Sequence, residues 1–217
     1  MKLIHWFLHI LFPPKCVLCR RLLEARETDL CARCRVEAPG YPCGKRKLQF
    51  LDSFAAVWYY EGSVRGSLLR YKFHNARGYA PAYGRLLAMK LYREYPDGFD
   101  VLTWVPVCPL RKFRRGYDQV ELLARAVGQE LGLAPVPVLK KIRNNRQQSR
   151  ITGTAERRAN VLGAYRMMNP EAVRGKRVLL LDDILTTGAT AGECARMLLT
   201  AGAEEVHCAV IAAARSK

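Results

Sequence analysis

The chain has 217 residues, of which 50% are hydrophobic and 25% are charged. This composition supports a buried core and excludes disordered and fibrous chains. The 36 Lys and Arg residues outnumber the 19 Asp and Glu residues, and the resulting net charge of +17 indicates a polyanionic partner or substrate: a nucleic acid, a phosphorylated metabolite or an anionic membrane.

The chain begins with a short apolar segment, residues 3–12, which ends at Pro13 and Pro14. Two histidines interrupt the segment, no small-residue cleavage site follows it, and it is shorter than the roughly 20 apolar residues that cross a bilayer. We therefore predict a packed or amphipathic first helix, with contact to a membrane as the alternative. Since no other apolar run is long enough to span a membrane, we expect a cytoplasmic protein.

Four of the eight cysteines form two closely spaced pairs, Cys16-x2-Cys19 and Cys31-x2-Cys34. This spacing places four thiolates around one tetrahedral Zn²⁺, and the metal adds folding free energy to a segment with little core of its own. Two disulfides are the alternative, which the missing signal peptide and the scattered downstream cysteines disfavour. The spacing therefore predicts a structural zinc site.

The pattern changes between residues 39 and 47, where prolines, glycines and basic residues interrupt it. We predict an N-terminal helix and zinc module over residues 1–47, and a second domain over residues 48–217. In that domain strands are predicted at 54–60, 101–107, 177–181 and 206–213, and helices at 62–73, 79–92, 117–131 and 188–201. This alternation predicts an α/β fold with a mainly parallel sheet covered by helices.

The most informative segment is 178–190, which reads VLLLDDILTTGAT. Its apolar strand ends in Asp182 and Asp183, at the edge of a parallel sheet where ligands bind. The turn that follows places threonine hydroxyls and backbone N–H groups at a helix N-terminus, which binds anions. Adjacent carboxylates accept hydrogen bonds from vicinal hydroxyls or hold Mg²⁺ through water. The segment therefore predicts recognition of a phosphorylated ribose.

A simpler explanation of this segment is that its polar residues only cap the next helix. One cap needs one such residue, so capping alone accounts poorly for the whole pattern. Neither a G-x-x-x-x-G-K-[ST] nor a G-x-G-x-x-G sequence occurs in the chain, which argues against an ordinary nucleoside triphosphatase or dinucleotide-binding enzyme.

The segment LLLDDILTTGAT resembles the phosphoribosyl pyrophosphate (PRPP) signature of type I phosphoribosyltransferases. The chain as a whole resembles the ComF family of competence-associated proteins, through LFPPKCVLC, WYYEGSVRGSLLRYKF, VPVCPLRKFRRGYDQVELLA and QQSRITGTAERRANVLGAY. The resemblance implies a type I phosphoribosyltransferase-like parallel sheet flanked by helices, with a small N-terminal zinc ribbon. The family often has Asn where this chain has Asp118, and of a second cysteine knuckle only Cys43 is present.

The resemblance also implies roles for individual residues. Asp182 and Asp183 would bind the ribose hydroxyls, directly or through Mg²⁺, and are the candidate catalytic residues. Val107 and Cys108 lie where this fold receives pyrophosphate. The residues that would surround the 5′-phosphate of PRPP are Thr186, Thr187, Gly188, Ala189 and Thr190.

Much of the positive charge lies between residues 111 and 177, and residues 140–158 are basic with almost no large apolar side chains. Such a segment cannot form a core, so we predict a mobile hood over the site, which either closes over pyrophosphate or contacts a nucleic-acid backbone. The candidate nucleic-acid residues are Lys140, Lys141, Arg143 and Arg146.

The function that the resemblance implies is binding of PRPP and single-stranded DNA in natural competence and DNA uptake. Competence proteins such as a DNA helicase would be partners. A phosphoribosyltransferase of nucleotide salvage or amidophosphoribosyl transfer, with no DNA role, is one alternative. A non-catalytic, PRPP-regulated DNA-binding module is another, and the sequence leaves the acceptor nucleophile unidentified.

Overall fold

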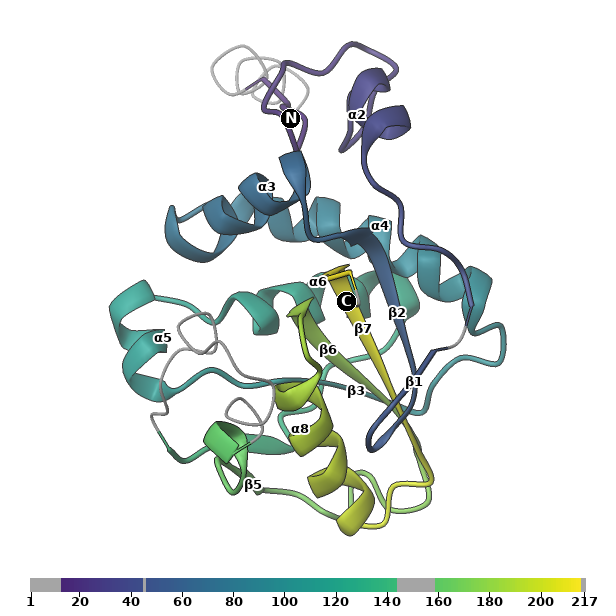
Figure 1. The fold of residues 1–217 in the computed structure, drawn as a ribbon, viewed down its shortest axis with the longest axis vertical. Coiled ribbons are helices and arrows are strands. Elements are labelled where there is room, and N and C mark those ends of the chain that lie inside the picture. The colour runs from purple at the N-terminus through teal and green to yellow at the C-terminus, as the bar shows by residue number, and fades with distance from the viewer. Residues whose placement is uncertain (1–12, 45, 144–158, 216–217) are drawn as a thin grey trace, which may run out of the picture.

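The computed structural model describes residues 13–44, 46–143 and 159–215 (Figure 1). The predicted apolar helix at residues 1–12 lies outside this part of the chain, as does most of the predicted hood, residues 144–158. Within the described ranges, no helix is both long enough and apolar enough to cross a bilayer.

The centre of the structure is a five-stranded sheet with the order β1-β2-β7-β6-β3. Its strands are β1 (Arg46–Leu48), β2 (Leu51–Tyr59), β7 (Glu205–Ala213), β6 (Arg177–Leu185) and β3 (Val101–Trp104). Strand β1 runs antiparallel to β2, and the other four strands are parallel to one another. The run from Val178 to Leu181 is wholly buried, as expected of a central parallel strand with both faces covered.

Helices cover both faces of the sheet, so the predicted α/β architecture is confirmed (Figure 1). On one face, Leu179 and Leu181 pack in a core with α3 (Gly62–Phe73), α4 (Ala80–Glu94) and α6 (Gln119–Leu131). On the other face, Val178 and Leu180 pack with α8 (Ala189–Thr200) and a small hairpin. That hairpin pairs β4 (Leu139–Lys141) with β5 (Tyr165–Met167). The alternation along β6 follows from the two-residue period of a strand.

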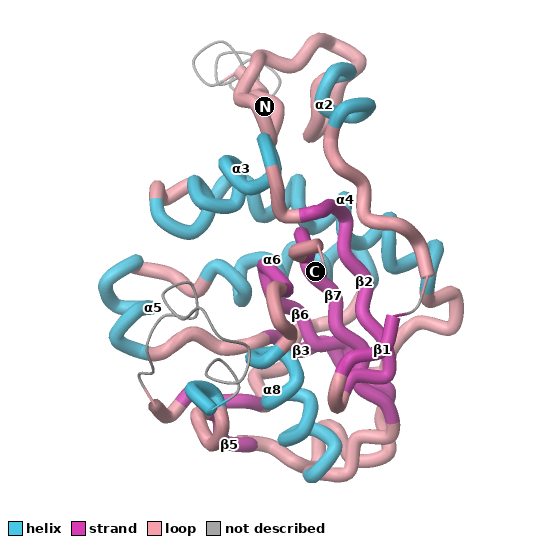
Figure 2. The backbone as a smooth tube through the Cα atoms, in the orientation of Figure 1, coloured by secondary structure: helices cyan, strands magenta, loops and turns pink. Residues whose placement is uncertain are grey.

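Over residues 13–44, the described part of the N-terminal module is mostly loop, with one short helix, α2 (Ala32–Glu37) (Figure 2). Its residues Val17, Leu18 and Leu30 are buried in the same core as α3 and α4. The Ser67 hydroxyl donates a hydrogen bond to the Val17 carbonyl. The predicted boundary between residues 47 and 48 lies inside β1, and it stays a prediction.

The observed strand bounds differ from the predicted ones, and two of the differences affect the site. Strand β3 ends at Trp104 rather than at residue 107, and Pro106, which has no N–H to pair, lies in the loop that follows. Strand β6 continues past the acidic pair to Leu185, because Asp182 pairs with Val210 and Leu185 with Ala213 on β7. The acidic pair is therefore part of the strand rather than of the turn.

Candidate functional site

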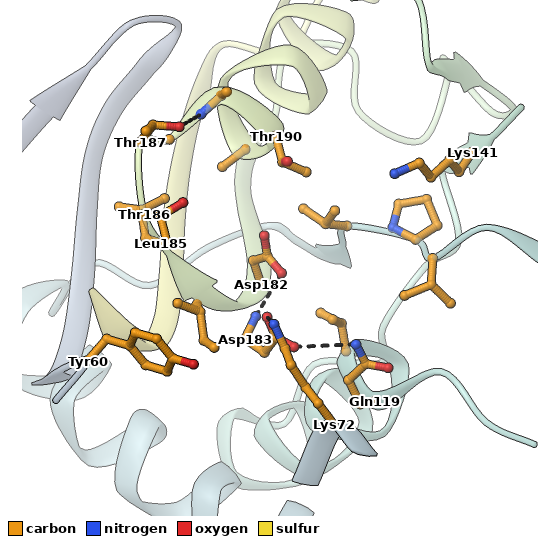
Figure 3. A pocket seen from close by; sticks show the side chains of 18 of the residues that line it. Tyr60, Lys72, Gln119, Lys141, Asp182, Asp183, Leu185, Thr186, Thr187 and Thr190 are labelled. Atoms are coloured by element: carbon orange, nitrogen blue, oxygen red, sulfur yellow. Dashed lines mark hydrogen bonds and ion pairs between the residues drawn. The ribbon is translucent and has the colours of Figure 1, made fainter. Parts of the chain in front are cut away.

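A cavity of about 240 Å³ lies at the carboxyl end of the parallel strands. Its walls come from the end of β6, the loop leading into α8, the loop after β3, the ends of α3 and α6, and the β4–β5 hairpin (Figure 3). Ligands bind at this edge in open α/β sheets. Asp182, Asp183 and the whole predicted phosphate segment 186–190 line this cavity.

The two acidic residues at the end of β6 are adjacent in sequence but have different surroundings. Asp183 faces α3 and α6 and is buried, with its Oδ1 2.8 Å from the Nζ of Lys72 and its Oδ2 3.3 Å from the Nε2 of Gln119. Asp182 is partly exposed, and its Oδ1 accepts a hydrogen bond of 2.8 Å from the Asp183 N–H. Figure 3 shows the Asp182 carboxylate pointing into the cavity, while Asp183 lies among its partners. The two carboxylates therefore present different chemistry to a ligand.

The acidic pair concentrates negative charge at the cavity wall. Burial, together with the neighbouring Asp183 carboxylate, raises the pKa of Asp182, while Lys72 acts in the opposite direction. Hydroxyl donors or a divalent cation would stabilise the ionised form of Asp182. The site thus offers a carboxylate that gains from binding a cation or a diol.

The predicted anion cradle is the loop before α8. Gly188 has a φ of 74° and precedes the first residue of the helix. This left-handed conformation favours glycine. Thr187 Oγ1 accepts a hydrogen bond of 3.4 Å from the Ala189 N–H, so the turn is held by its own side chain. The N-terminus of a 12-residue helix points its first N–H groups and the positive end of its dipole toward this loop.

The loop after β3 forms another part of the wall. Val107 lines the cavity, whereas Cys108 is buried and precedes α5 (Pro109–Arg115). The Val107 N–H donates a hydrogen bond of 3.1 Å to Asp118 Oδ2. The role of this loop toward pyrophosphate stays a prediction.

The sequence analysis missed four polar residues of the cavity: Tyr60, Lys72, Gln119 and Tyr165. Lys72 lies near the end of the predicted helix 62–73, and nothing local distinguishes it from a surface lysine. Only the packing of α3 and α6 against β6 brings Lys72 and Gln119 to the acidic pair. Gln119 was within reach of the sequence analysis, since it belongs to the RGYDQ segment that carries part of the resemblance.

The structure describes three of the four predicted nucleic-acid residues and does not bring them all to one surface. Lys141 lines the cavity, where its Nζ lies 3.2 Å from the Tyr165 hydroxyl. Lys140 and Arg143 are exposed, and Arg146 lies outside the described residues. A strand turns successive side chains to opposite faces, which explains why Lys140 and Lys141 do not share a surface.

The predicted metal residues come together in the N-terminal module. The sulfur atoms of Cys16, Cys19, Cys31 and Cys34 all lie within 4.8 Å of one another. The sulfurs of Cys19 and Cys31 are 3.6 Å apart, close to the edge of roughly 3.8 Å for a tetrahedron with Zn–S bonds of about 2.3 Å. Three of the four cysteines are buried. This donor set fits a closed structural zinc site.

Comparison with known proteins gives consistent matches. Residues 85–217 match the family described as phosphoribosyl transferase domain. The chain is 29% identical to the DNA utilization protein YhgH of Salmonella typhi, over 95% of this chain and 90% of that protein. It is 25% identical to competence protein F of Haemophilus influenzae, over 89% of this chain and 94% of that protein. It is 26% identical to competence protein ComFC of Bacillus subtilis, over 86% of this chain and 78% of that protein.

The family match covers more than half of the chain and includes the acidic pair and the loop before α8. The relatives align with most of its length. The chain belongs to the phosphoribosyltransferase family, and over most of its length it is similar to competence proteins of the ComF type.

Proposed function

We propose that this chain binds PRPP together with Mg²⁺ in the cavity at the end of β6, and that it acts in DNA uptake and handling. One observation carries the first part of the proposal. The partly exposed carboxylate of Asp182 and the N-terminal loop of α8 line the same cavity. An anion cradle beside a carboxylate fits a ligand that has both a phosphate and vicinal hydroxyls.

Different residues of the cavity would bind different groups of the proposed ligand. Asp182 would accept hydrogen bonds from the ribose hydroxyls or hold Mg²⁺ through water, while Asp183 fixes the strand end through Lys72 and Gln119. The loop 186–190 would surround the 5′-phosphate. Val107 and the cations Lys72 and Lys141 line the remaining wall, where a pyrophosphate group would meet positive charge. Bound Mg²⁺ would supply further charge neutralisation to the pyrophosphate.

The proposed role in DNA uptake rests on the relatives and on charge. Relatives named competence protein F, ComFC and DNA utilization protein align with 86% or more of this chain. Its net charge of +17 favours contact with a polyanion. Lys140, on the hairpin strand that supplies Lys141, and Arg143, two residues after that strand, are both exposed, so a DNA backbone would approach the cavity from this side. A competence protein such as a DNA helicase is the proposed partner.

Calorimetric titration with PRPP tests the proposed ligand. Wild-type protein is expected to bind PRPP with Mg²⁺ and to bind it more weakly after Mg²⁺ is removed. Asp182→Asn should lose most of this affinity. Asp100→Asn is the matched control, because Asp100 precedes β3 and its carboxylate accepts a hydrogen bond from the N–H of Arg177, the first residue of β6, away from the cavity. This variant should bind PRPP like wild type. Absence of binding to wild-type protein at millimolar PRPP would reject the proposal.

Repeating the titration with a single-stranded oligonucleotide present distinguishes the models of the function. Competition would place DNA and PRPP on one surface, cooperative binding would support regulation of DNA binding by PRPP, and independent binding would place them apart. A nucleotide-salvage or amidophosphoribosyl enzyme without a DNA role would bind PRPP and leave the oligonucleotide unbound.

A further inference from the structure

We infer that Asp118 is a positioning residue that sets the loop after β3 for the pyrophosphate half of the ligand, an inference that rests on the proposed function. Asp118 is buried and precedes α6. Its side chain contacts two separate pieces of backbone, the first turn of α6 and the cavity-lining loop at Val107.

The two carboxylate oxygens of Asp118 have separate partners. Oδ1 accepts hydrogen bonds of 2.9 and 3.1 Å from the N–H groups of Val120 and Glu121, which is an ordinary helix cap. Oδ2 accepts the hydrogen bond of 3.1 Å from the Val107 N–H. The cap needs one oxygen only, so the contact of the second oxygen with the Val107 N–H is additional to capping.

The hydrogen bond between Val107 and Asp118 joins the two ends of the chain segment that contains α5. Pro106 and Pro109 have no N–H, so the backbone donors within residues 106–109 are those of Val107 and Cys108. Asp118 engages the first of these donors and thereby fixes the peptide between Pro106 and Val107 at the cavity wall. One buried oxygen atom thus helps to hold the wall where pyrophosphate is proposed to bind, together with the backbone hydrogen bond from Val105 N–H to Leu181.

The next residue along the chain serves the other half of the cavity. Gln119 donates its hydrogen bond to Asp183, on the ribose side of the proposed ligand. Asp118 and Gln119 therefore connect the start of α6 to both walls, and a change at residue 118 is expected to act on the pyrophosphate half selectively.

Replacement of Asp118 by Asn separates capping from positioning. The amide oxygen of Asn still caps α6. Its NH₂ group is a donor and cannot accept the Val107 N–H, so two donors would face each other. Asp118→Ser is a second variant, because a serine hydroxyl caps a helix but is too short to serve both partners. Asp100→Asn is the matched control at the opposite edge of the sheet.

The experiment measures the dissociation constants of PRPP, pyrophosphate and ribose 5-phosphate for these proteins, with the exchange rate of the Val107 amide by NMR. Both Asp118 variants should weaken PRPP and pyrophosphate binding about tenfold, the effect of one lost hydrogen bond to a charged group, and leave ribose 5-phosphate within about twofold of wild type. The Val107 amide should exchange slowly in wild-type protein and faster in both variants.

Each other outcome has a definite meaning. Unchanged pyrophosphate affinity in both variants would overturn the positioning role while leaving PRPP binding established. Equal losses for pyrophosphate and ribose 5-phosphate would show a general structural role instead, and would also overturn the inference. If wild-type protein binds no PRPP, the proposed function fails, and the exchange of the Val107 amide alone then decides whether Asp118 holds the loop: fast exchange in wild-type protein overturns it.

Discussion

Asp182 and Asp183 show how two identical neighbours acquire different roles from their surroundings. Strand geometry turns Asp183 toward Lys72 and Gln119, where its charge is compensated within the protein. Asp182 turns to the other face and lines the cavity, and burial raises its pKa. Asp182 is suited to ligand binding at a cost in folding stability, and Asp183 is suited to holding the end of β6.

This difference predicts opposite effects of neutralising each acid. Asp182→Asn should leave the melting temperature unchanged or higher, because it removes a carboxylate that is partly desolvated beside another, and should lose most of the affinity for PRPP. Asp183→Asn leaves the Lys72 ammonium without its partner and should cost about 1–3 kcal/mol of folding free energy, a range that allows for the partial exposure of Lys72. Denaturation curves and calorimetry measure the two effects. Equal destabilisation by both variants would contradict this assignment.

At the scale of elements, helix α3 connects the cysteine module to the cavity. In its middle the Ser67 hydroxyl and the Arg70 guanidinium donate hydrogen bonds to carbonyls of the module. Near its end Lys72 pairs with Asp183. The module and α3 share one buried core, so loss of the metal is expected to reach the sheet through this helix.

Removal of zinc therefore tests whether the cysteine module and the sheet unfold together. If the four-cysteine cluster holds zinc, then chelation of the metal, or Cys31→Ser, should lower the melting temperature by more than about 5 °C in a single transition, since a structural zinc site contributes folding free energy directly. Cys43→Ser is the matched control and should have no effect, because Cys43 is exposed and lies outside the four-sulfur cluster. Scanning calorimetry makes the measurement. Two separate transitions would show instead that the module unfolds independently.

At the scale of the whole molecule, the net charge of +17 would attract the phosphates of a nucleic acid. Phosphate contacts release counterions, so affinity for single-stranded DNA should fall as salt rises. Phosphates carry no sequence information, and little sequence preference is expected. A defined DNA-binding surface differs from non-specific attraction by the overall positive charge in that its phosphate contacts come from particular residues.

A pair of charge-matched variants tests that location. Lys140→Ser with Arg143→Ser should reduce the slope of log affinity against log salt by about 0.7 for each phosphate contact removed. Arg174→Ser with Lys176→Ser removes the same charge from exposed positions before β6, at the opposite edge of the sheet, and should leave the slope unchanged. Fluorescence anisotropy over a salt series measures both. Equal slopes for the two variants would reject a binding surface near the β4–β5 hairpin.

The sequence by itself determined those features whose residues are close together in the chain. Cys16, Cys19, Cys31 and Cys34 form their cluster through local hairpins and one helix turn, and their spacing alone predicted it. The alternation of apolar strands and amphipathic helices likewise predicted the layered sheet. The acidic pair and the loop before α8 were predicted because strand, turn and helix follow one another directly.

Only the tertiary structure decided how the site is completed, because its remaining contacts join residues far apart in the chain. Gln119 and Asp183 are separated by 64 positions, and Lys72 reaches the same carboxylate from another helix. The length of β6 also depended on its pairing with β7, which carried the acids into the strand and turned them to opposite faces. Local patterns specify each element, but which side chains of two elements meet depends on packing against a shared sheet, and no local pattern contains that information.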